Sequence, residues 1–492
     1  MSELLPLYRP AQVRAMDERA IGALGVPAYT LMTRAGTAAW RLLRQRWPGA
    51  QTVGVACGPG NNGGDGHVLA RLARAAGCQV HVLALPGGGP RSAHARQALA
   101  DWRAAGGSVA SFDGRLPQAD VWVDALYGTG LTRAPCEAAQ AMIERINASR
   151  LPVLALDVPS GLDADTGHAV GAAVRATVTI SFIGAKRGLY TGMARDFCGE
   201  VLVDPLELPG AGFADIAPAA WRCRPDSLAR WLAPRHANTH KGEYGHVLCI
   251  GGEVGMGGAV RLCAEAALRV GAGLASVATR SAGVAALVAA RPEAMTHAVE
   301  DVAALQPLLD RATVLAVGPG LGQGEWGQAL YRAALASGKP LVLDADALNL
   351  LSADPGPVPQ AILTPHPGEA ARLLGQDKRE VQADRFGAAQ ALAQRYRCVV
   401  VLKGAGTLVA TPEQSPMVIG AGNPGMATGG MGDVLSGVIA ALLAQQLPAF
   451  QAAVAGALLH SAAGDAAAGI GGERGLLPSD LFPYLRRLAN PG

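Results

Sequence analysis

The stretch Asn423-Pro-Gly-Met-Ala-Thr-Gly-Gly-Met-Gly-Asp433 decides the fold of the C-terminal half, because it joins a glycine run to the apolar residues 434–443. The apolar positions in 434–443 recur with a helical period, which predicts a buried helix that begins where the glycines end. The first N–H groups of a helix have no partner within it, and glycine lets an anion come close to them. The stretch therefore predicts an anion hole with Asp433 at its edge. A glycine-rich turn in which Asp433 merely caps the helix is the alternative.

The whole chain has 492 residues, which is more than one hydrophobic core usually holds, so two domains are expected. Strand-like apolar runs alternate with helical patterns in both halves, which predicts two α/β domains with parallel sheets wrapped by helices. These runs are residues 52–57, 79–85, 121–124, 153–157, 247–251, 313–318, 341–344 and 398–402. Residues 205–226 are rich in proline and lack periodicity. We therefore expect domains at 1–218 and 225–492.

The composition excludes several classes of partner. Aromatic residues make up only 4% of the chain, and the net charge of +3 comes from 42 basic and 39 acidic residues without a basic block, so no nucleic acid is expected. Residues 452–470 are apolar but contain His460 and Asp465, so no membrane partner is expected. The eight cysteines form no CxxC pair and are expected to be reduced and buried. We expect a cytoplasmic protein that self-associates as a homo-oligomer.

The first glycine-rich loop, Val53-Gly-Val-Ala-Cys-Gly-Pro-Gly-Asn-Asn-Gly-Gly-Asp-Gly66, leads from a predicted strand into a helical pattern at 67–76. Gly58, Gly60 and Gly63 satisfy the dinucleotide fingerprint, but the acidic residue expected about 20 residues later is absent. A conventional redox dinucleotide site is therefore not expected. The side-chain oxygens of Asn61, Asn62 and Asp65 indicate a hard cation nearby.

Two more loops at predicted strand ends supply carboxylates. Asp124 begins Asp-Ala-Leu-Tyr-Gly-Thr-Gly130, and Asp157 begins Asp-Val-Pro-Ser-Gly-Leu-Asp163, which also contains Ser160. Loops at the carboxyl ends of parallel strands face one crevice, so these groups are expected to meet there. Helix capping by either aspartate is the alternative.

Through GPGNNGGDG, VDALYGTGL and LDVPSGLDADTG, nearly the whole N-terminal domain resembles the epimerase domain of the bifunctional NAD(P)HX repair enzymes. The resemblance implies a Rossmann-like fold and interconversion of the R and S forms of hydrated NADH and NADPH. It implies a potassium ion held by Asn62, Asp124 and Ser160. The substrate contacts it implies are Asn61, Asn62, Gly63, Gly64, Asp65, Gly128, Thr129, Gly130, Leu131, Thr132, Arg133, Ala134 and Asp157.

Epimerisation at a carbon that bears both nitrogen and hydroxyl can proceed by loss and return of water through an iminium-like species. One carboxylate can serve first as acid and then as base, and Asp157 is the candidate. Asp124 is less suited if a cation holds it ionised.

In the C-terminal half, Leu363-Thr-Pro-His-Pro-Gly-Glu369 fixes His366 between two prolines, which favours a positioned binding role over a merely structural histidine. Val399-Val-Val-Leu-Lys-Gly-Ala-Gly-Thr407 puts Lys403 at a strand end before two glycines, an arrangement that can hold nucleotide phosphates although it is no Walker loop. A solvated lysine in a turn is the alternative.

Through HKGEYGHVL, GPGLG, TPHPGEAARLL, VLKGAGT and NPGMATGGMGDVLSG, nearly the whole half resembles the NAD(P)HX dehydratase domain, which is ribokinase-like. The resemblance implies removal of the hydroxyl of the S epimer at the cost of ADP or ATP hydrolysis. ADP is favoured as co-substrate, and Mg²⁺ is expected with it. The implied contacts with the hydrated nicotinamide nucleotide are Ala259, Gly320, His366 and Asp433. The implied ADP contacts are Lys403, Gly404, Ala405, Gly406, Thr407 and Gly432.

Hydroxide is a poor leaving group, and phosphorylation converts it into a good one. Asp433 is expected to take the hydroxyl proton while the glycine amides stabilise the transferring phosphoryl group. The sequence thus predicts a bifunctional metabolite-repair enzyme acting on NADHX and NADPHX. The alternatives are a ribokinase-type small-molecule kinase and, for the N-terminal domain, a nucleotide-binding module without catalysis.

Overall fold

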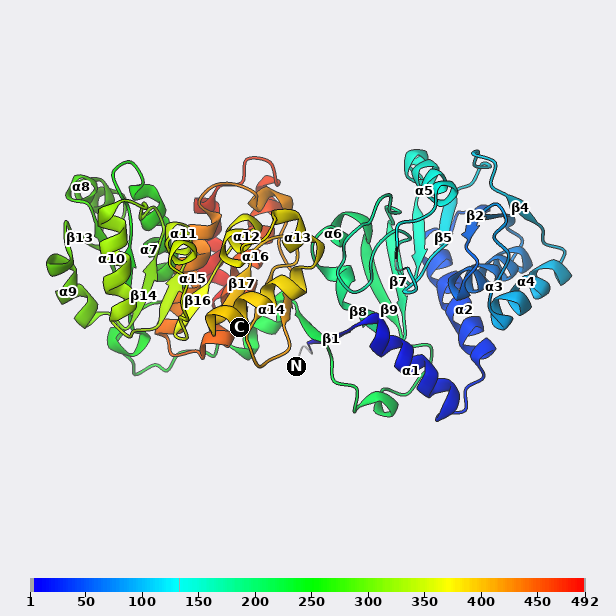
Figure 1. The fold of residues 1–492 in the computed structure, drawn as a ribbon, viewed down its shortest axis with the longest axis horizontal. Helices are drawn as coiled ribbons and strands as arrows, with labels where there is room; N and C mark the ends of the chain where they lie inside the picture. Colours follow the sequence, from blue (N-terminus) through cyan, green and yellow to red (C-terminus); the bar gives the residue numbers. More distant parts are fainter. Residues whose placement is uncertain (1–3, 132, 491–492) are drawn as a thin grey trace. The chain divides into compact units, whose positions relative to one another are not determined.

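The structure is a computed structural model that describes residues 4–131 and 133–490. Its residues divide into two compact units, Pro6–Ala220 and residues 221–490. Each unit has its own sheet and its own core, and Figure 1 shows the helices that cover each sheet.

The N-terminal unit contains a seven-stranded parallel sheet of order β4-β3-β2-β5-β6-β7-β9. The strands are β2 (Thr52–Cys57), β3 (Gln79–Ala84), β4 (Val109–Ser111), β5 (Val121–Ala125), β6 (Val153–Leu156), β7 (Val178–Phe182) and β9 (Glu200–Asp204). The order reverses between β2 and β5, which makes this sheet Rossmann-like and places a crevice at their carboxyl ends. A short parallel pair, β1 (Leu5–Tyr8) and β8 (Ala185–Lys186), was not predicted.

Helices cover both faces of this sheet because its strands are apolar on both sides. In β5, Val121 and Val123 join one core cluster, while Trp122 between them joins the other. The first cluster contains side chains of α2 (Ala28–Arg46), α3 (Asn61–Ala75) and α4 (Ala93–Ala104), and the second contains those of α5 (Glu137–Ser149). Helix α1 (Pro10–Gly22) belongs to a smaller cluster.

The C-terminal unit contains the strand order β13-β12-β11-β14-β15-β16-β17-β18-β19-β10. The strands are β10 (Ala220–Cys223), β11 (His246–Ile250), β12 (Leu274–Thr279), β13 (Met295–Ala298), β14 (Val314–Val317), β15 (Leu341–Leu343), β16 (Ala361–Leu363), β17 (Val399–Leu402), β18 (Leu408–Ala410) and β19 (Met417–Ile419). The prediction of a wholly parallel sheet is wrong here, because β18 runs antiparallel to both β17 and β19. Only five residues separate β17 from β18, which permits a hairpin and not a helical crossover.

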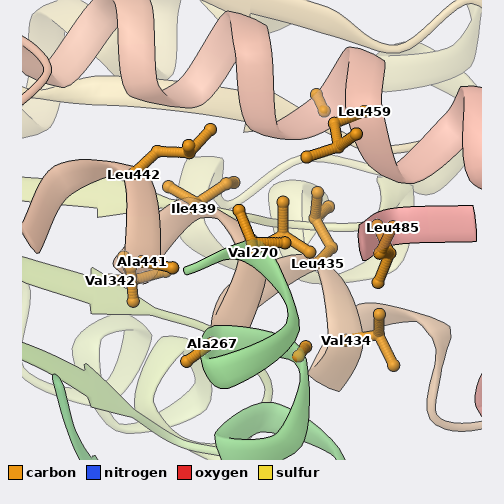
Figure 2. Packing of buried hydrophobic residues seen from close by; sticks show 14 of the residues in the cluster. Ala267, Val270, Val342, Val434, Leu435, Ile439, Ala441, Leu442, Leu459 and Leu485 are labelled. Atoms are coloured by element: carbon orange, nitrogen blue, oxygen red, sulfur yellow. The ribbon is translucent and has the colours of Figure 1, made fainter. Parts of the chain in front are cut away.

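One face of the C-terminal sheet carries the largest core. It is built by α7 (Gly257–Val270), α15 (Met431–Ala444), α16 (Ala449–Gly471) and α17 (Phe482–Leu488). Figure 2 shows Ile439 of α15 among Val270, Leu459 and Leu485 from the other three helices. Within the described residues, α16 is the one helix long and apolar enough to cross a membrane, yet 72% of its apolar stretch is buried inside this unit.

The remaining helices of this unit connect its parallel strands. They are α8 (Ser281–Ala290), α9 (Val302–Arg311), α10 (Glu325–Ala336), α11 (Asp346–Ala353), α12 (Pro367–Leu374), α13 (Lys378–Ala383) and α14 (Arg385–Tyr396). They leave the loops after β14, β15, β16 and β17 at one edge of the sheet, where the predicted dehydratase residues lie.

Two helices begin earlier than predicted. Helix α3 begins at Asn61 and not near residue 67, so the glycines of the first loop form its first turns. A methyl group at Gly63 would lie 2.0 Å from the carbonyl oxygen of Gly58, and one at Gly66 would lie 2.7 Å from Cβ of Ala125. These glycines therefore permit close packing of the helix. Similarly, α15 begins at Met431, so Asp433 lies in its first turn.

All eight cysteines are free, as predicted. Seven are buried. Cys136 is exposed, which corrects the expectation of burial for all eight; it occupies the N-cap position of α5, outside the core.

Candidate active sites

A cleft of about 1290 Å³ lies at the carboxyl ends of β2, β5 and β6. Glycine loops meet there without side chains between them: Gly58 donates a backbone hydrogen bond to Ala125 (2.9 Å), and a methyl group at Gly128 would lie 3.6 Å from Cβ of Asn62. The sequence-predicted residues that line the cleft are Asn61, Asn62, Asp65, Gly128, Thr129, Gly130, Leu131, Arg133, Ala134 and Asp157. Gly63 and Gly64 are buried in α3 and are not among the lining residues, and Thr132 lies outside the described residues.

Asp157 lies in the cleft, paired with a lysine that sequence reasoning missed. Its Oδ1 accepts a hydrogen bond from Nζ of Lys186, whose side chain is 1% exposed. The same Nζ donates to the carbonyl oxygen of Phe182 (2.8 Å), and the side chain of Asp157 stays 17% exposed. The buried cation thus holds a carboxylate whose other oxygen faces the cleft. Asp157 also has a φ of +67°, a left-handed conformation rare outside glycine, which turns the chain sharply after β6.

Two more carboxyl groups share this cleft. Asp65 on α3 is buried, and burial together with the charges of Asp157 and Asp17 raises its pKa well above the ordinary value. Burial and the charge of Asp157 also raise the pKa of Asp17 on α1. Lys186 therefore interacts with three carboxyl groups. Because the environments of these carboxyl groups differ, one of them can serve as an acid and another as a base.

Beneath the cleft, Asp124 and Ser160 form a buried polar pair. Oδ1 of Asp124 accepts from Oγ of Ser160 (2.6 Å), and Oδ2 accepts from its backbone N–H (2.7 Å). Asp124 is 0% exposed, and burial raises its pKa to about 6 although the Ser160 and Leu126 hydrogen bonds oppose the shift. Neither Asp124 nor Asp157 caps a helix, so the capping alternative fails for both.

Asn62 is the unsatisfied group of this region. It is 7% exposed, and neither oxygen nor nitrogen of its side-chain amide has a hydrogen-bond partner. A buried amide without partners costs free energy unless a ligand or ion satisfies it. The unpaired oxygen of Asn62, the buried carboxylate of Asp124 and the hydroxyl of Ser160 are oxygen donors of the kind that a hard cation prefers.

In the C-terminal unit, the N-terminus of α15 forms the predicted anion hole. Val434 is the first residue whose N–H bonds back within the helix, to the carbonyl oxygen of Gly430 at 3.1 Å. The N–H groups of Met431, Gly432 and Asp433 precede that ladder and are available to an anion. Asp433 is partly buried, and burial together with the charge of Asp344 raises its pKa to about 7.

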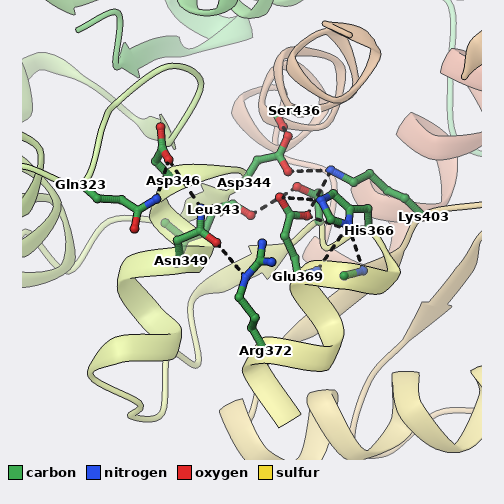
Figure 3. A network of polar contacts seen from close by, with 12 residues as sticks. Gln323, Leu343, Asp344, Asp346, Asn349, His366, Glu369, Arg372, Lys403 and Ser436 are labelled. Atoms are coloured by element: carbon green, nitrogen blue, oxygen red, sulfur yellow. Dashed lines mark hydrogen bonds and ion pairs between the residues drawn. The ribbon is translucent and has the colours of Figure 1, made fainter. Parts of the chain in front are cut away.

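Asp344 organises the polar network beside this anion hole, as Figure 3 shows. Its Oδ1 accepts from Nζ of Lys403 (2.7 Å) and its Oδ2 from Oγ of Ser436 on α15 (2.9 Å). Burial alone would raise the pKa of Asp344, but Lys403 and the hydrogen bonds lower it below its ordinary value. A methyl group at Gly432 would lie 3.2 Å from Nζ of Lys403. The lysine cation and the free amides of α15 are therefore neighbours.

His366 caps α12 and points into the same network. Its Nδ1 accepts from the backbone N–H of Gly368 (2.9 Å), while its backbone N–H donates to Glu369 (2.7 Å). Burial and the charge of Lys403 lower the pKa of His366, which favours the neutral ring, and about half of the side chain is exposed. Glu369, which is buried, also lies 3.7 Å from Nζ of Lys403.

The other predicted dehydratase residues lie on neighbouring loops. A methyl group at Gly320 would lie 3.4 Å from Cβ of Ala259, so the β14 loop touches the start of α7. The segment from Lys403 to Thr407 turns through Gly404 (φ +136°) and Gly406 (φ +61°), and Oγ1 of Thr407 donates to the carbonyl oxygen of Gly404 (3.0 Å). The side chain of Lys403 is turned toward Asp344, so the alternative of a solvated lysine in a turn is wrong.

A fully buried arginine supports that turn. The guanidinium of Arg385 donates to the carbonyl oxygens of Leu402 (3.2 Å) and Lys403 (3.3 Å). Burial lowers its pKa to about 10. Sequence reasoning missed Lys186, Asp344 and Arg385; Asp344 ends a predicted strand just as Asp124 does, and that position was its only signal.

Comparison with known proteins agrees with this geometry. Residues 247–487 match the protein family described as NAD(P)H-hydrate dehydratase, and residues 28–188 match the family described as YjeF-related protein N-terminus. Two relatives named bifunctional NAD(P)H-hydrate repair enzyme are similar over the whole chain. The protein of Coxiella burnetii is 49% identical over 490 residues, 99% of each chain, and that of Escherichia coli K12 is 46% identical over 480 residues, 97% of this chain and 93% of its own.

Among solved structures, a ribokinase-like superfamily protein of Enterococcus faecalis V583 is 30% identical, with a TM-score of 0.52. The match covers 55% of this chain and 95% of that protein. The C-terminal unit is therefore ribokinase-like.

Proposed function

The chain belongs to the bifunctional NAD(P)H-hydrate repair enzymes, and from that premise we propose which residues carry its two reactions. It is an NAD(P)H-hydrate epimerase and an NAD(P)H-hydrate dehydratase in one polypeptide. We assign the epimerase to a domain at residues 1–218 and the dehydratase to one at 225–492. The observation that carries this assignment is that each unit holds an aspartate near a lysine: Asp157 pairs with Lys186, whose side chain is 1% exposed, and Asp433 lies near Lys403, whose side chain is 19% exposed.

In the epimerase, Asp157 is the proton carrier. In its protonated form it gives a proton to the departing hydroxyl, which leaves as water, and the resulting carboxylate, paired with Lys186, then removes a proton from the water that adds to the other face of the ring. Lys186 holds the carboxylate in one orientation, and Asp65 is a second carboxyl group in reach of the same cleft. The glycine loops at 61–65 and 128–134 enclose the substrate.

Asn62, Asp124 and Ser160 hold a potassium ion. The unpaired amide oxygen of Asn62 and the buried carboxylate of Asp124 support this assignment. A bound potassium ion supplies positive charge that offsets Asp124 and ties together the α3, β5 and β6 loops. Asp124 is thereby reserved for the ion, which leaves the proton transfers to Asp157.

In the dehydratase, Asp433 takes the proton of the substrate hydroxyl while the phosphoryl group is transferred to the oxygen of that hydroxyl. The N–H groups at the start of α15 and the cation of Lys403 stabilise charge on that phosphoryl group. Departure of phosphate together with loss of a proton from the neighbouring ring carbon then restores the double bond of NADH or NADPH. Ala259, Gly320 and His366 contact the hydrated nicotinamide nucleotide, and Lys403–Thr407 with Gly432 contact ADP.

Mg²⁺ accompanies the nucleotide. Among residues 4–131 and 133–490, no group of three or more His, Cys, Asp or Glu could hold a metal ion by itself. Mg²⁺ commonly binds through substrate phosphates, waters and one or two carboxylates, so it needs no cluster of three protein ligands and can arrive bound to the nucleotide. Lys403 and the amides of α15 then hold the phosphates in place.

We also infer a cytoplasmic location, since all eight cysteines are free and seven are buried, as in proteins of a reducing compartment. The partners are NADHX, NADPHX and ADP, and the apolar helices favour self-association. Size-exclusion chromatography with light scattering tests the last point, and a monomeric mass would contradict it.

The experiment that tests the pair of reactions follows absorbance at 340 nm in a mixture of both NADHX epimers with Mg²⁺ and either ADP or ATP. We expect complete recovery of NADH with ADP. Recovery that stops at the S fraction would remove the epimerase role from the N-terminal unit, and recovery with ATP alone would replace ADP as the co-substrate.

A further inference from the structure

A second cavity, of about 470 Å³, lies in the C-terminal unit at the amino ends of its strands. It is lined by the first residues of β11, β12 and β13, namely His246, Leu274 and Met295. The dehydratase residues sit on loops at the carboxyl ends of the same parallel sheet. The cavity is therefore separate from the dehydratase site, and its volume is that of a small-molecule pocket.

The sheet presents one consistent face to this cavity. His246 is in register with Leu274, and Ser276 is in register with Met295, so these side chains share the face opposite the α7 and α15 core. Helix α9 covers this face and contributes Leu308 and, at its C-terminus, Arg311. Leu274, Met295 and Leu308 are the apolar side chains of the lining.

The polar groups of the cavity are basic. Its ten lining residues include His246, His297 and Arg311 and no Asp or Glu. Nε2 of His246 is fixed at 2.8 Å from Oγ of Ser276. Within the described part of the chain, His297 has no hydrogen-bond partner and Arg311 has no ion pair. Burial and the positive charge of Arg311 lower the pKa of both histidines, as expected for basic groups that face one another without an acid.

We propose that this cavity is a second ligand site, which binds a small organic anion with an apolar or aromatic body. The anion would face the side chains of Arg311 and His297, for which residues 4–131 and 133–490 supply no hydrogen-bond or ion-pair partner. The body would lie against Leu274, Met295 and Leu308. Neither the epimerase nor the dehydratase reaction requires this site.

The test is isothermal titration calorimetry of the full chain with phenyl phosphate, benzyl alcohol and inorganic phosphate, each in the presence of saturating ADP and Mg²⁺. The nucleotide occupies the anion hole of α15, so phenyl phosphate that still binds does so elsewhere. We expect saturable binding of phenyl phosphate, and at least about ten-fold weaker binding of benzyl alcohol and of inorganic phosphate.

Two variants locate the site. Arg311→Gln and His297→Gln should each weaken phenyl phosphate about ten-fold, because a charge-assisted hydrogen bond is lost. Arg332→Gln is the matched control, because Arg332 is an exposed arginine of α10 that does not line the cavity, and it should change nothing. Arg311 is exposed, so its variant should fold. Binding abolished by ADP, binding unchanged in both cavity variants, or inorganic phosphate as strong as phenyl phosphate would each overturn the proposal.

Discussion

At the scale of single residues, both sites place a largely inaccessible lysine near the proposed catalytic aspartate: the side chain of Lys186 is 1% exposed and that of Lys403 is 19% exposed. Lys186 contacts Asp157 directly, whereas Lys403 is held by Asp344 beside the turn that carries Asp433. The direct ion pair leaves one carboxylate oxygen of Asp157 for the substrate. The indirect arrangement leaves Asp433 with a pKa raised to about 7, close to what a general base needs at neutral pH.

Asp433→Asn should abolish ADP-dependent formation of NADH and stabilise the fold at alkaline pH. The folded-state pKa of about 7 exceeds the ordinary value of 3.8, so the wild-type carboxylate destabilises the fold increasingly as pH rises through that interval. Asparagine cannot ionise, so the variant should gain roughly 1–2 kcal/mol at pH 8 and almost nothing near pH 4. Urea unfolding at both pH values measures the gain. Equal stability of the two proteins at pH 8 would contradict the buried charge.

Lys186→Met should remove the epimerase and spare the dehydratase. Methionine fills much of the same volume but leaves Asp157 without the cation that orients it, and loss of orientation costs about 100-fold or more in rate. Consumption of the S epimer reports that the C-terminal unit is folded, and a thermal melt of the full chain reports whether the N-terminal unit, which contains Lys186, is folded as well. Lys339→Met is the control, since Nζ of Lys339 also donates to a backbone carbonyl (Ala312, 2.6 Å) but lies in the C-terminal unit. Normal epimerisation by the Lys186 variant would exclude its positioning role.

At the scale of elements, eight strands were predictable because they are short, mostly apolar runs: the predicted 52–57 coincides with β2, whereas β7 and β12 were not predicted. Helix starts within glycine runs were not predictable, because Gly63 and Gly66 serve the contact of α3 with Gly58 and Ala125, which no local pattern shows. Asp124 and Asp157 were found since they end strands. Lys186 ends a two-residue strand, and Arg385 begins a helix 17 residues before Leu402, so only the tertiary structure reveals their roles.

Gly63→Ala should destabilise the N-terminal unit and impair the epimerase. The new methyl group would lie 2.0 Å from the carbonyl oxygen of Gly58, a backbone atom that cannot move without shifting the loop. Overpacking of this kind costs about 1–3 kcal/mol. Gly60→Ala is the matched control, because no atom lies within 4 Å of a methyl group there and φ is negative, so its cost should stay within about 0.5 kcal/mol. Equal unfolding midpoints for the two variants would refute the packing role.

Potassium should stabilise the N-terminal unit by joining its α3, β5 and β6 loops. Replacing choline chloride with potassium chloride at constant ionic strength should raise the melting temperature by a few degrees and speed epimerisation. Asn62→Leu should abolish both responses, because the orphaned amide oxygen is lost, and its removal leaves no buried partner unsatisfied. Asn490→Leu is the control, because Asn490 lies at an exposed site. Asn147→Leu would not serve, because the side-chain amide of Asn147 forms hydrogen bonds with the backbone at Ala173 and Arg175. If the melting temperature is the same in potassium chloride and in choline chloride, the three residues have a structural role only.

At the scale of the whole molecule, fusion has a chemical reason. A dehydratase that accepts one epimer leaves the other unrepaired unless an epimerase supplies it. Each unit has its own sheet, core and site, so neither needs residues of the other for its chemistry.

If the epimers diffuse freely between sites, the two activities should complement one another in trans. Asp157→Asn should convert only the S fraction of an NADHX mixture, and Asp433→Asn should convert none. An equimolar mixture of the two variants should nevertheless restore complete recovery of absorbance at 340 nm, since each supplies the site that the other lacks. The rate of the slow phase should rise with the concentration of the Asp433→Asn protein, which supplies the epimerase. The double variant should stay inactive at any concentration. A mixture that stops at the S fraction would mean that the substrate passes between sites within one chain, and the independence argued from the separate cores would be wrong.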